Sequence, residues 1–211
     1  SGVAVDSVTR LQNILLANQV PLTASGVPSS RLGDQGSVLG AIDFAPPSST
    51  SGTAYNLTVN GSWQKTNPAV PLTTALPTTS ASRTNVNAGL QARHSSYLTL
   101  RGVGVLTETN VSANRAESSG DPLLDLPGGR VRVNSTFADG TNGVQLLSFG
   151  GNQFLGTSQT TTDLQAANTL SWFSGNNKHR LKLASELRRE GAAQDQTTNR
   201  LGTFTYNSLS D

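Results

Sequence analysis

The side chains that most often do chemistry in proteins are sparse in this sequence. It contains two histidines, His94 and His179, and no cysteine. Neither histidine has a second histidine or a carboxylate at the spacing that holds a metal ion on a helix. Glu186 lies in the same segment as His179, but at period two it falls on the opposite face of a strand. We therefore expect no metal site and no cofactor.

Carboxylates from distant segments are the remaining candidates for catalysis. Asp43, Glu108 and Asp163 would form an acidic pair for glycoside hydrolysis if the fold brought two of them together. The sequence has no G-x-S-x-G motif, no P-loop, and no G-x-G-x-x-G motif between a strand and a helix. We expect that the protein is not an enzyme.

Charged and apolar side chains alternate most clearly in the segment 178–190, KHRLKLASELRRE. At period two, one face of this segment carries Leu181, Leu183 and Leu187. The opposite face carries Arg180, Lys182, Glu186 and Arg188. Such alternation is typical of a β-strand between an apolar and a polar medium, and at helical spacing the leucines form no clean stripe. The segment 162–173 alternates in the same way, and residues 174–177 between the two segments predict a hairpin turn.

The composition favours a β-protein with polar loops. Only 13% of the 211 residues are charged, about half the usual share, and 35% are hydrophobic. The net charge of +2 is too small for a nucleic-acid-binding surface, so we expect no nucleic acid partner. No apolar run of about 18 residues occurs, which excludes a helical membrane span but not a span made of strands. The sequence has no methionine, even at position 1, so we expect a processed or internal piece of a protein.

The pattern of apolar residues predicts one helix and a series of strands. The helix is expected at 8–19, with Ser7 as its N-cap and an apolar stripe of Val8, Leu11, Ile14 and Leu15. Strands are expected near 37–44, 53–64, 83–93, 95–111, 130–137, 144–149, 162–173, 178–190 and 202–209. No βαβ spacing occurs, so a parallel α/β sheet is not expected. We expect an all-β fold, an antiparallel up-and-down meander over residues 1–211 that forms a single segment of a transmembrane β-barrel. The alternative is a β-sandwich.

The segment 53–64 carries Tyr55 and Trp63 at the two ends of its apolar face. Aromatic residues in these places are typical of a strand that crosses a bilayer, where they form girdles at both interfaces. The same pattern fits a sandwich strand with large residues at its rim. This strand alone does not distinguish the two folds.

The segments LPGGRVRVNS, LLSFGGN, NTLSWFSGNNKHRLKLASELRRE and LGTFTYNSLSD follow one another in the last third of the chain. They resemble the barrel region of TonB-dependent outer-membrane receptors, especially the Oar-like receptors that carry a carboxypeptidase-regulatory-like domain. In that family a strand of the type W…HxxKxxxExR leads through a loop to GxFxFNSLxD. The matching positions are Trp172, His179, Lys182, Glu186, Arg188, Gly202, Phe204, Tyr206, Asn207, Ser208, Leu209 and Asp211. The resemblance covers residues 120–211, and more loosely 37–112 by pattern.

The chain departs from the family in having no recognisable plug domain, no TonB box and no closing strand that ends in an aromatic residue. The resemblance therefore implies a partial barrel from a transport or receptor protein of the bacterial outer membrane. Its partners would be outer-membrane lipid, the remainder of the barrel and the plug, and a TonB-type energiser that acts through the plug. The lipid-facing side chains would be Tyr55, Trp63, Trp172, Leu181, Leu183 and Leu187. The lumen-facing side chains would be Arg180, Lys182, Glu186 and Arg188.

A second hypothesis belongs to a different class of protein. The same strands would suit a secreted soluble or fibre-forming β module, in which strands of neighbouring copies pair edge to edge. Alternation within strands does not separate the two hypotheses, because both place one face against an apolar medium and the other against water.

Overall fold

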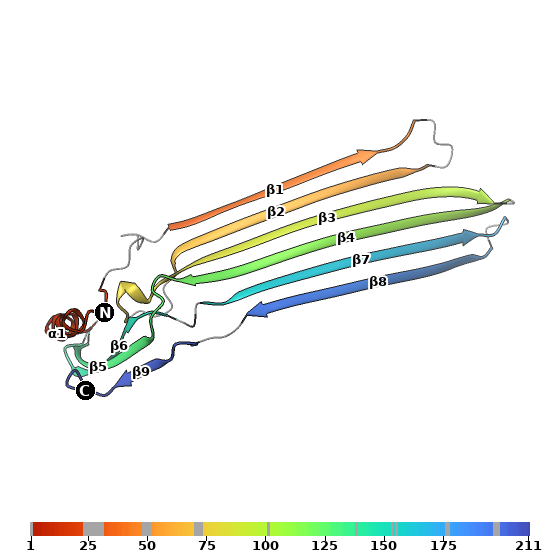
Figure 1. The fold of residues 1–211 in the computed structure, drawn as a ribbon. Coiled ribbons are helices and arrows are strands. Elements are labelled where there is room, and N and C mark those ends of the chain that lie inside the picture. The colour runs from red at the N-terminus through yellow and green to blue at the C-terminus, as the bar shows by residue number, and fades with distance from the viewer. Residues whose placement is uncertain are drawn as a thin grey trace.

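The computed structural model describes residues 2–22, 32–47, 52–69, 74–100, 102–137, 139–152, 154, 156–175, 178–195 and 199–211. These residues form a six-stranded sheet and a three-stranded sheet. Figure 1 shows the long strands of the large sheet extending from a small base, where the helix, the second sheet and both chain ends lie. We call the opposite end of the large sheet the tip.

The large sheet is an antiparallel meander with the strand order β1-β2-β3-β4-β7-β8. Its strands are β1 (Leu32–Phe44), β2 (Ala54–Ala69), β3 (Ala81–Leu100), β4 (Val103–Pro122), β7 (Ser158–Phe173) and β8 (Arg180–Asp195). Within the described residues β1 and β8 are its two edges, so the sheet is open. The all-β antiparallel fold expected from the sequence is confirmed for this sheet.

The base is a small layer formed by the connections between β2 and β3 and between β4 and β7, together with the two ends of the chain. It contains α1 (Val5–Ala17), the 3-10 helix η1 (Pro77–Thr79), β5 (Gly128–Thr136), β6 (Asn142–Gly150) and β9 (Thr203–Tyr206). Its sheet has the order β6-β5-β9, and β9 runs parallel to β5. The base adds one parallel pair to the antiparallel meander, because the end of the chain returns beside β5, which comes much earlier in the sequence.

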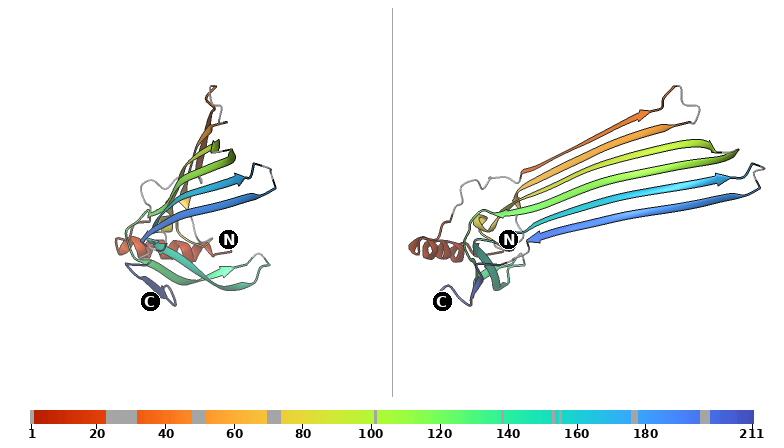
Figure 2. Two further views of the ribbon diagram at one scale, coloured as in Figure 1. Left: turned by 90° about the vertical axis from the view of Figure 1, so that its right-hand side faces the viewer. Right: turned by 45° about the vertical axis from the view of Figure 1, so that its right-hand side comes forward.

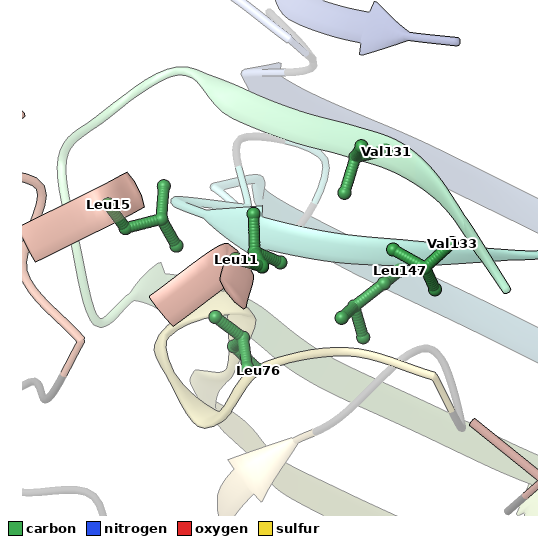
Figure 3. Packing of buried hydrophobic residues seen from close by; sticks show 6 residues of the cluster. All are labelled: Leu11, Leu15, Leu76, Val131, Val133 and Leu147. Carbon is green, nitrogen blue, oxygen red and sulfur yellow. The ribbon is translucent and has the colours of Figure 1, made fainter. Parts of the chain in front are cut away.

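The core of the molecule lies in the base. It consists of six buried apolar side chains, Leu11, Leu15, Leu76, Val131, Val133 and Leu147 (Figure 3). Leu11 and Leu15 lie one helical turn apart, and Val131 and Val133 share a face at period two, so helix and strand each bury one side. Burial of a side chain of this size contributes about 1.5–3 kcal/mol. This cluster therefore holds the helix to the small sheet.

The helix begins earlier than its sequence indicates. Ser7 lies inside the first turn, whereas Ala4 occupies the N-cap position and makes no side-chain capping bond, so the expected Ser7 cap is wrong. Val3 pairs with Ser135, and the amide of Ala4 donates to the carbonyl of Asn134 at 3.4 Å. Because pairing with β5 fixes the direction of the chain before the helix, the start of α1 needs no capping side chain.

The expected strand 95–111 is two strands. β3 continues to Leu100, the chain reverses, and β4 begins at Val103. Gly102 has a φ of 79°, a left-handed conformation that glycine adopts readily. The reversal places Leu98 opposite Val105 and Tyr97 opposite Leu106. Leu106 therefore lies on the face opposite to Leu98, although continuous alternation through 95–111 would put them together.

Other strands of the large sheet are longer than their alternation indicates. β1 begins at Leu32, β4 extends to Pro122 and β8 extends to Asp195. These extensions show no regular alternation of large apolar and polar residues, and their backbone groups are paired with those of a neighbouring strand. Pairing therefore extends the strands beyond the segments in which apolar and polar residues alternate. In the base, β9 is shorter than the expected strand 202–209.

Candidate functional site on the two faces of the large sheet

Backbone pairing sorts the side chains of the large sheet into an apolar face and a polar face. The pairs Val59–Leu90, Leu170–Leu183 and Trp172–Leu181 show how apolar residues meet across strands. The large side chains of the apolar face are Val38, Ile42, Phe44, Tyr55, Leu57, Val59, Trp63, Val86, Leu90, Leu98, Val105, Val111, Leu164, Leu170, Trp172, Leu181, Leu183 and Leu187. The apolar face is thus continuous over all six strands.

Most of these side chains are exposed. Ile42 is 67% exposed, Leu181 68% and Leu187 74%. Figure 2 shows that the base lies at one end of the large sheet and covers neither face along the length of the strands. A contiguous apolar patch larger than a few hundred Å² is rare on soluble monomers and marks a surface that contacts another protein or a membrane. The apolar face is therefore the first candidate functional surface.

The apolar residues form a band that crosses the strands obliquely. On the base side the band ends at Trp63 in β2, at Ala113 in β4 and at Leu187 in β8. Through the successive pairings Trp63 is level with Ala193 of β8, which lies six residues beyond Leu187. Six residues span about 20 Å along a strand, and the four pairings between β2 and β8 span about 19 Å across the sheet. Between β2 and β8 the limit of the band is therefore inclined by about 45° to the strands.

Polar side chains inside the band contact neighbours within the sheet. The side-chain amide of Asn168 donates to the hydroxyl oxygens of Thr107 (3.2 Å) and Thr109 (2.8 Å), and to the carbonyl of Glu108 (3.3 Å). The ring of His94 lies 4.9 Å from that of Tyr55. Hydrogen bonding within the sheet lowers the cost of placing such groups in an apolar medium.

The polar face is rich in amide, hydroxyl and charged side chains. Its polar members include Gln35, Ser37, Asn56, Asn60, Ser62, Gln64, Asn85, Asn87, Gln91, Arg93, Glu108, Asn110, Asn114, Ser118, Gln159, Asp163, Gln165, Arg180, Lys182, Glu186 and Arg188.

Many of these side chains bond across strands. Arg93 pairs with Glu108 at 2.8 Å, Arg188 with Asp163 at 2.8 Å, and Gln165 donates to Glu186 at 2.8 Å. Arg188 also contacts Glu190 at 2.6 Å. The polar face is therefore a hydrogen-bonded surface in which both signs of charge alternate.

The polar face is hollowed along part of its length. A concavity of about 760 Å³ is lined mainly by polar-face residues of β1, β2, β3, β4 and β7, among them Gln64, Asn85 and Gln159. A second hollow of about 320 Å³ lies nearer the tip, beside Gln91, Arg93 and Glu108. Both lie on the same side of the sheet. The geometry therefore suits a hydrated polar interior on this side.

The residues singled out by sequence separate cleanly between the two faces. Arg180, Lys182, Glu186 and Arg188 all lie on the polar face. Tyr55, Trp63, Trp172, Leu181, Leu183 and Leu187 all lie on the apolar face. Arg180 also lies over the ring of Phe173, 5.2 Å from its centroid.

The fold does not bring the candidate catalytic carboxylates together. Asp43, Glu108 and Asp163 share the polar face, but Asp163 is level with Asn114, six residues along β4 from Glu108. That separation is about 20 Å, beyond the range of paired carboxylates in glycosidases. Each carboxylate has its own partner instead, Asn56 for Asp43, Arg93 for Glu108 and Arg188 for Asp163. The described residues contain no group of three or more potential metal ligands.

Sequence reasoning missed part of both faces. In β1, Val38, Ile42 and Phe44 belong to the apolar face, whereas Ala41 lies on the polar face. The concavity near Gln64 was not foreseen either, because its lining comes from five strands that are distant in sequence. The period-two pattern of β1 would have identified its face, but no local signal predicts the curvature of a sheet.

No helix in the described part of the chain is long and apolar enough to cross a membrane. Comparisons with protein-family models, with curated proteins and with solved structures found no match to this chain.

Proposed function

We propose that the large sheet is a wall segment of a transmembrane β-barrel in a bacterial outer membrane, with its apolar face toward lipid and its polar face toward the lumen. The observation that carries the proposal is the oblique apolar band over the large sheet. Strands of membrane barrels tilt by 35–45° from the barrel axis, so a level band of lipid crosses them obliquely. The inclination of about 45° found here agrees with that geometry.

The height of the band supports the same proposal. In β4 the apolar face runs from Val103 to Ala113, which spans about 33 Å along the strand. At the inclination of the band this corresponds to about 23 Å along the membrane normal, close to the apolar band of about 25 Å on barrels of this class. In an aligned β-sandwich the facing sheet runs within about 30° of the strands that it covers, which is less than the inclination found here.

The more specific proposal is a transport or receptor protein, the barrel portion of a TonB-dependent transporter. Its support is the resemblance of the segment that includes Trp172, His179 and Lys182, and of the segment 202–211, to that family. In this proposal the charges of the polar face, including Arg180, Lys182, Glu186 and Arg188, line the path of the substrate or contact the plug. A TonB-type energiser would act through that plug. A hydrated lining with side chains of both charge signs can contact a polar plug without binding it tightly.

A charge placed on each face of the same strand tests the orientation. Leu183→Arg places a cation on the apolar face, and we expect it to cost about 2–4 kcal/mol near the bilayer midplane and to reduce assembly in the outer membrane. Ala184→Arg is the matched control, because Ala184 is the next residue of β8 and lies on the polar face. The measurement is the amount of full-length protein recovered folded in the outer-membrane fraction. Equal recovery of the two variants would show that the apolar face does not meet lipid.

The second candidate is a secreted or fibre-forming β module. The observation in its favour is that β1 and β8 have no strand beyond them among the described residues, so that copies could pair edge to edge. Partition of the native protein between buffer and membranes, with its intact mass, separates the two candidates. Recovery only with membranes supports the barrel, whereas a water-soluble species of 22.0 kDa or a polymer of it would support the module.

A further inference from the structure

One row of side chains crosses the polar face of all six long strands and consists almost entirely of primary amides. Successive backbone pairings place its members side by side, one from each strand. They are Gln35, Gln64, Asn85, Ser118, Gln159 and Gln194. We call this set the amide row. A side-chain amide both donates and accepts hydrogen bonds, so the row presents donors and acceptors in every strand.

Most amides of the row have no partner in the protein. The Ser118 hydroxyl donates to the side-chain oxygen of Asn85 at 2.7 Å. Among the described residues, the side chains of the four glutamines of the row make no hydrogen bond, and all four are exposed. Every member of the row except Gln194 lines the concavity of about 760 Å³ on the polar face. The free donors and acceptors of the row are therefore available to a ligand in that concavity.

The concavity around the row carries little charge. The next row toward the tip consists of Ser37, Ser62, Asn87, Ala116, Thr161 and Ala192. Glu117 is the one charged residue among those that line the concavity, but its side chain belongs to the opposite face and pairs with Arg115. In the lining strands the next charges on the polar face are Arg83 at the base end and Asp163 at the tip end, and Asp163 is paired with Arg188. A charged ligand would lose hydration here without a matching set of charges, so the concavity favours a neutral ligand.

The spacing of the row suits a chain of repeating neutral units. Adjacent strands lie about 4.8 Å apart, so the six members span about 24 Å across the sheet. The strand spacing is close to the length of one sugar unit in an extended glycan, so a glycan that lies along the row meets one side chain per sugar. Its hydroxyl groups donate and accept hydrogen bonds, as the amides do. The row and a linear glycan are therefore complementary in both spacing and chemistry.

The row lies outside the apolar band, on its base side. In β2 and β3 it comes directly after Trp63 and Val86 in the direction of the base. In β8, Gln194 lies beyond Leu187, the last apolar residue of the band in that strand. In the proposed barrel the row therefore stands at the base-side mouth of the lumen, where a water-soluble ligand meets the membrane-spanning part.

We propose that the amide row binds a linear, uncharged oligosaccharide. The inference rests on the proposed barrel function and adds to it a class of substrate. The second hollow of the polar face has a different chemistry, because Arg93 and Glu108 lie beside it as an ion pair. Amides near that second hollow provide a matched control for those of the row.

Calorimetric titration of the purified full-length protein in detergent tests the row. The neutral probes are maltohexaose, cellohexaose, mannohexaose and xylohexaose. Hexagalacturonate adds a carboxylate to each sugar, and a capped, uncharged hexapeptide of serine and glycine replaces the sugar altogether. The test variant carries Gln64→Leu, Asn85→Leu and Gln159→Leu. The control variant carries Gln91→Leu, Asn110→Leu and Gln165→Leu, which removes the same three amides from the part of the polar face nearer the tip.

We expect at least one neutral hexasaccharide to bind, at least about tenfold more tightly than its disaccharide, because the longer chain meets more of the row. The test variant should bind that hexasaccharide at least about tenfold more weakly than the unchanged protein, and the control variant should bind it as the unchanged protein does. Equal binding by the two variants, or no binding of any neutral hexasaccharide, would overturn the inference. Hexagalacturonate bound as tightly would overturn the preference for a neutral ligand, and the peptide bound as tightly would overturn the assignment to a sugar.

Failure of the inference and failure of the barrel proposal give different results. If the unchanged protein is recovered in outer membranes but binds none of these sugars, the barrel stands and the glycan site falls. If the protein is soluble without detergent and Leu183→Arg has no more effect than Ala184→Arg, the barrel proposal falls, and with it the role of the row in uptake.

Discussion

Apolar side chains are buried in the base and exposed in the large sheet. In the base, Val131 and Leu147 are 2% and 5% exposed and pack within one cluster. In the large sheet, Leu181 and Leu187 are 68% and 74% exposed, although they alternate with polar residues just as regularly. The base therefore completes its core from its own residues, whereas the described residues leave the apolar face of the large sheet uncovered. Alternation shows that a strand has two faces, and only the packing around it shows what covers each face.

The largest effect is expected from a cavity in the base. Leu147→Ala removes a buried side chain from the cluster, and we expect it to lower the free energy of unfolding by about 2–5 kcal/mol. Leu146→Ala is the control, since Leu146 is the preceding residue of β6 and is 38% exposed. Unfolding of both variants in urea measures the difference. A similar loss in the two variants would mean that the base has no core of its own and would remove the contrast with the sheet.

Two glycines with positive φ sharpen the comparison between a packed and an open region. Gly150 in the base has a φ of 75°, and a Cβ there would meet the carbonyl oxygen of Pro127 at 2.5 Å. Gly102 at the tip has a φ of 79°, and a Cβ there would meet nothing within 4 Å. We expect Gly102→Ala to cost about 1–2 kcal/mol from the left-handed backbone alone, and Gly150→Ala to cost more because the backbone must also shift. Thermal unfolding of both variants gives the ranking, and the reverse order would contradict the packing described for the base.

The smallest effect concerns the turn between β5 and β6. The Asp139 carboxylate accepts hydrogen bonds from the Thr141 hydroxyl (2.7 Å) and the Thr141 amide (3.0 Å). The hydroxyl bond first, and then the amide bond, lower the pKa of Asp139 below its usual value. Because the folded pKa is lower than the unfolded one, the stabilisation is present above the unfolded pKa and is lost as pH falls through the folded pKa.

Acidification should therefore loosen this turn. The chemical shift of the Thr141 amide, followed by NMR from neutral to acidic pH, reports the change. Asp139→Asn keeps an acceptor oxygen but does not titrate in this range, so its amide shift should be independent of pH. An identical titration in that variant would assign the effect to another group.

Much of the large sheet could be predicted from sequence because its strands contain enough alternation to show both faces. Leu181, Leu183 and Leu187 were assigned to one face of β8, and the structure places them together. The boundary between β3 and β4 was missed because apolar residues continue on both sides of Arg101 and Gly102, and the pair is not a strong hairpin signal. The position of the reversal between β3 and β4 depends on which backbone groups pair with one another. The alternation of apolar and polar residues does not contain that information.

The base was less predictable because its elements are held by contacts between distant segments. The Ser7 cap was wrong because the pairing of Val3 with Ser135 sets the start of the helix. The parallel pairing of β9 with β5 has no local signature, since it depends on where the chain returns. The polar-face hollow near Gln64 depends in the same way on the curvature of five strands together. The assignment of the two faces to lipid and lumen stays a prediction.

Both ends of the chain are held by the same strand, and this arrangement has a mechanical consequence. Val3 pairs with Ser135 of β5, and Tyr206 pairs with Val131 of β5. A force that pulls the two ends apart is therefore borne first by these short pairings, and the large sheet lies outside the path of the load until they open. The base would therefore open first under load, while the long strands keep their pairing.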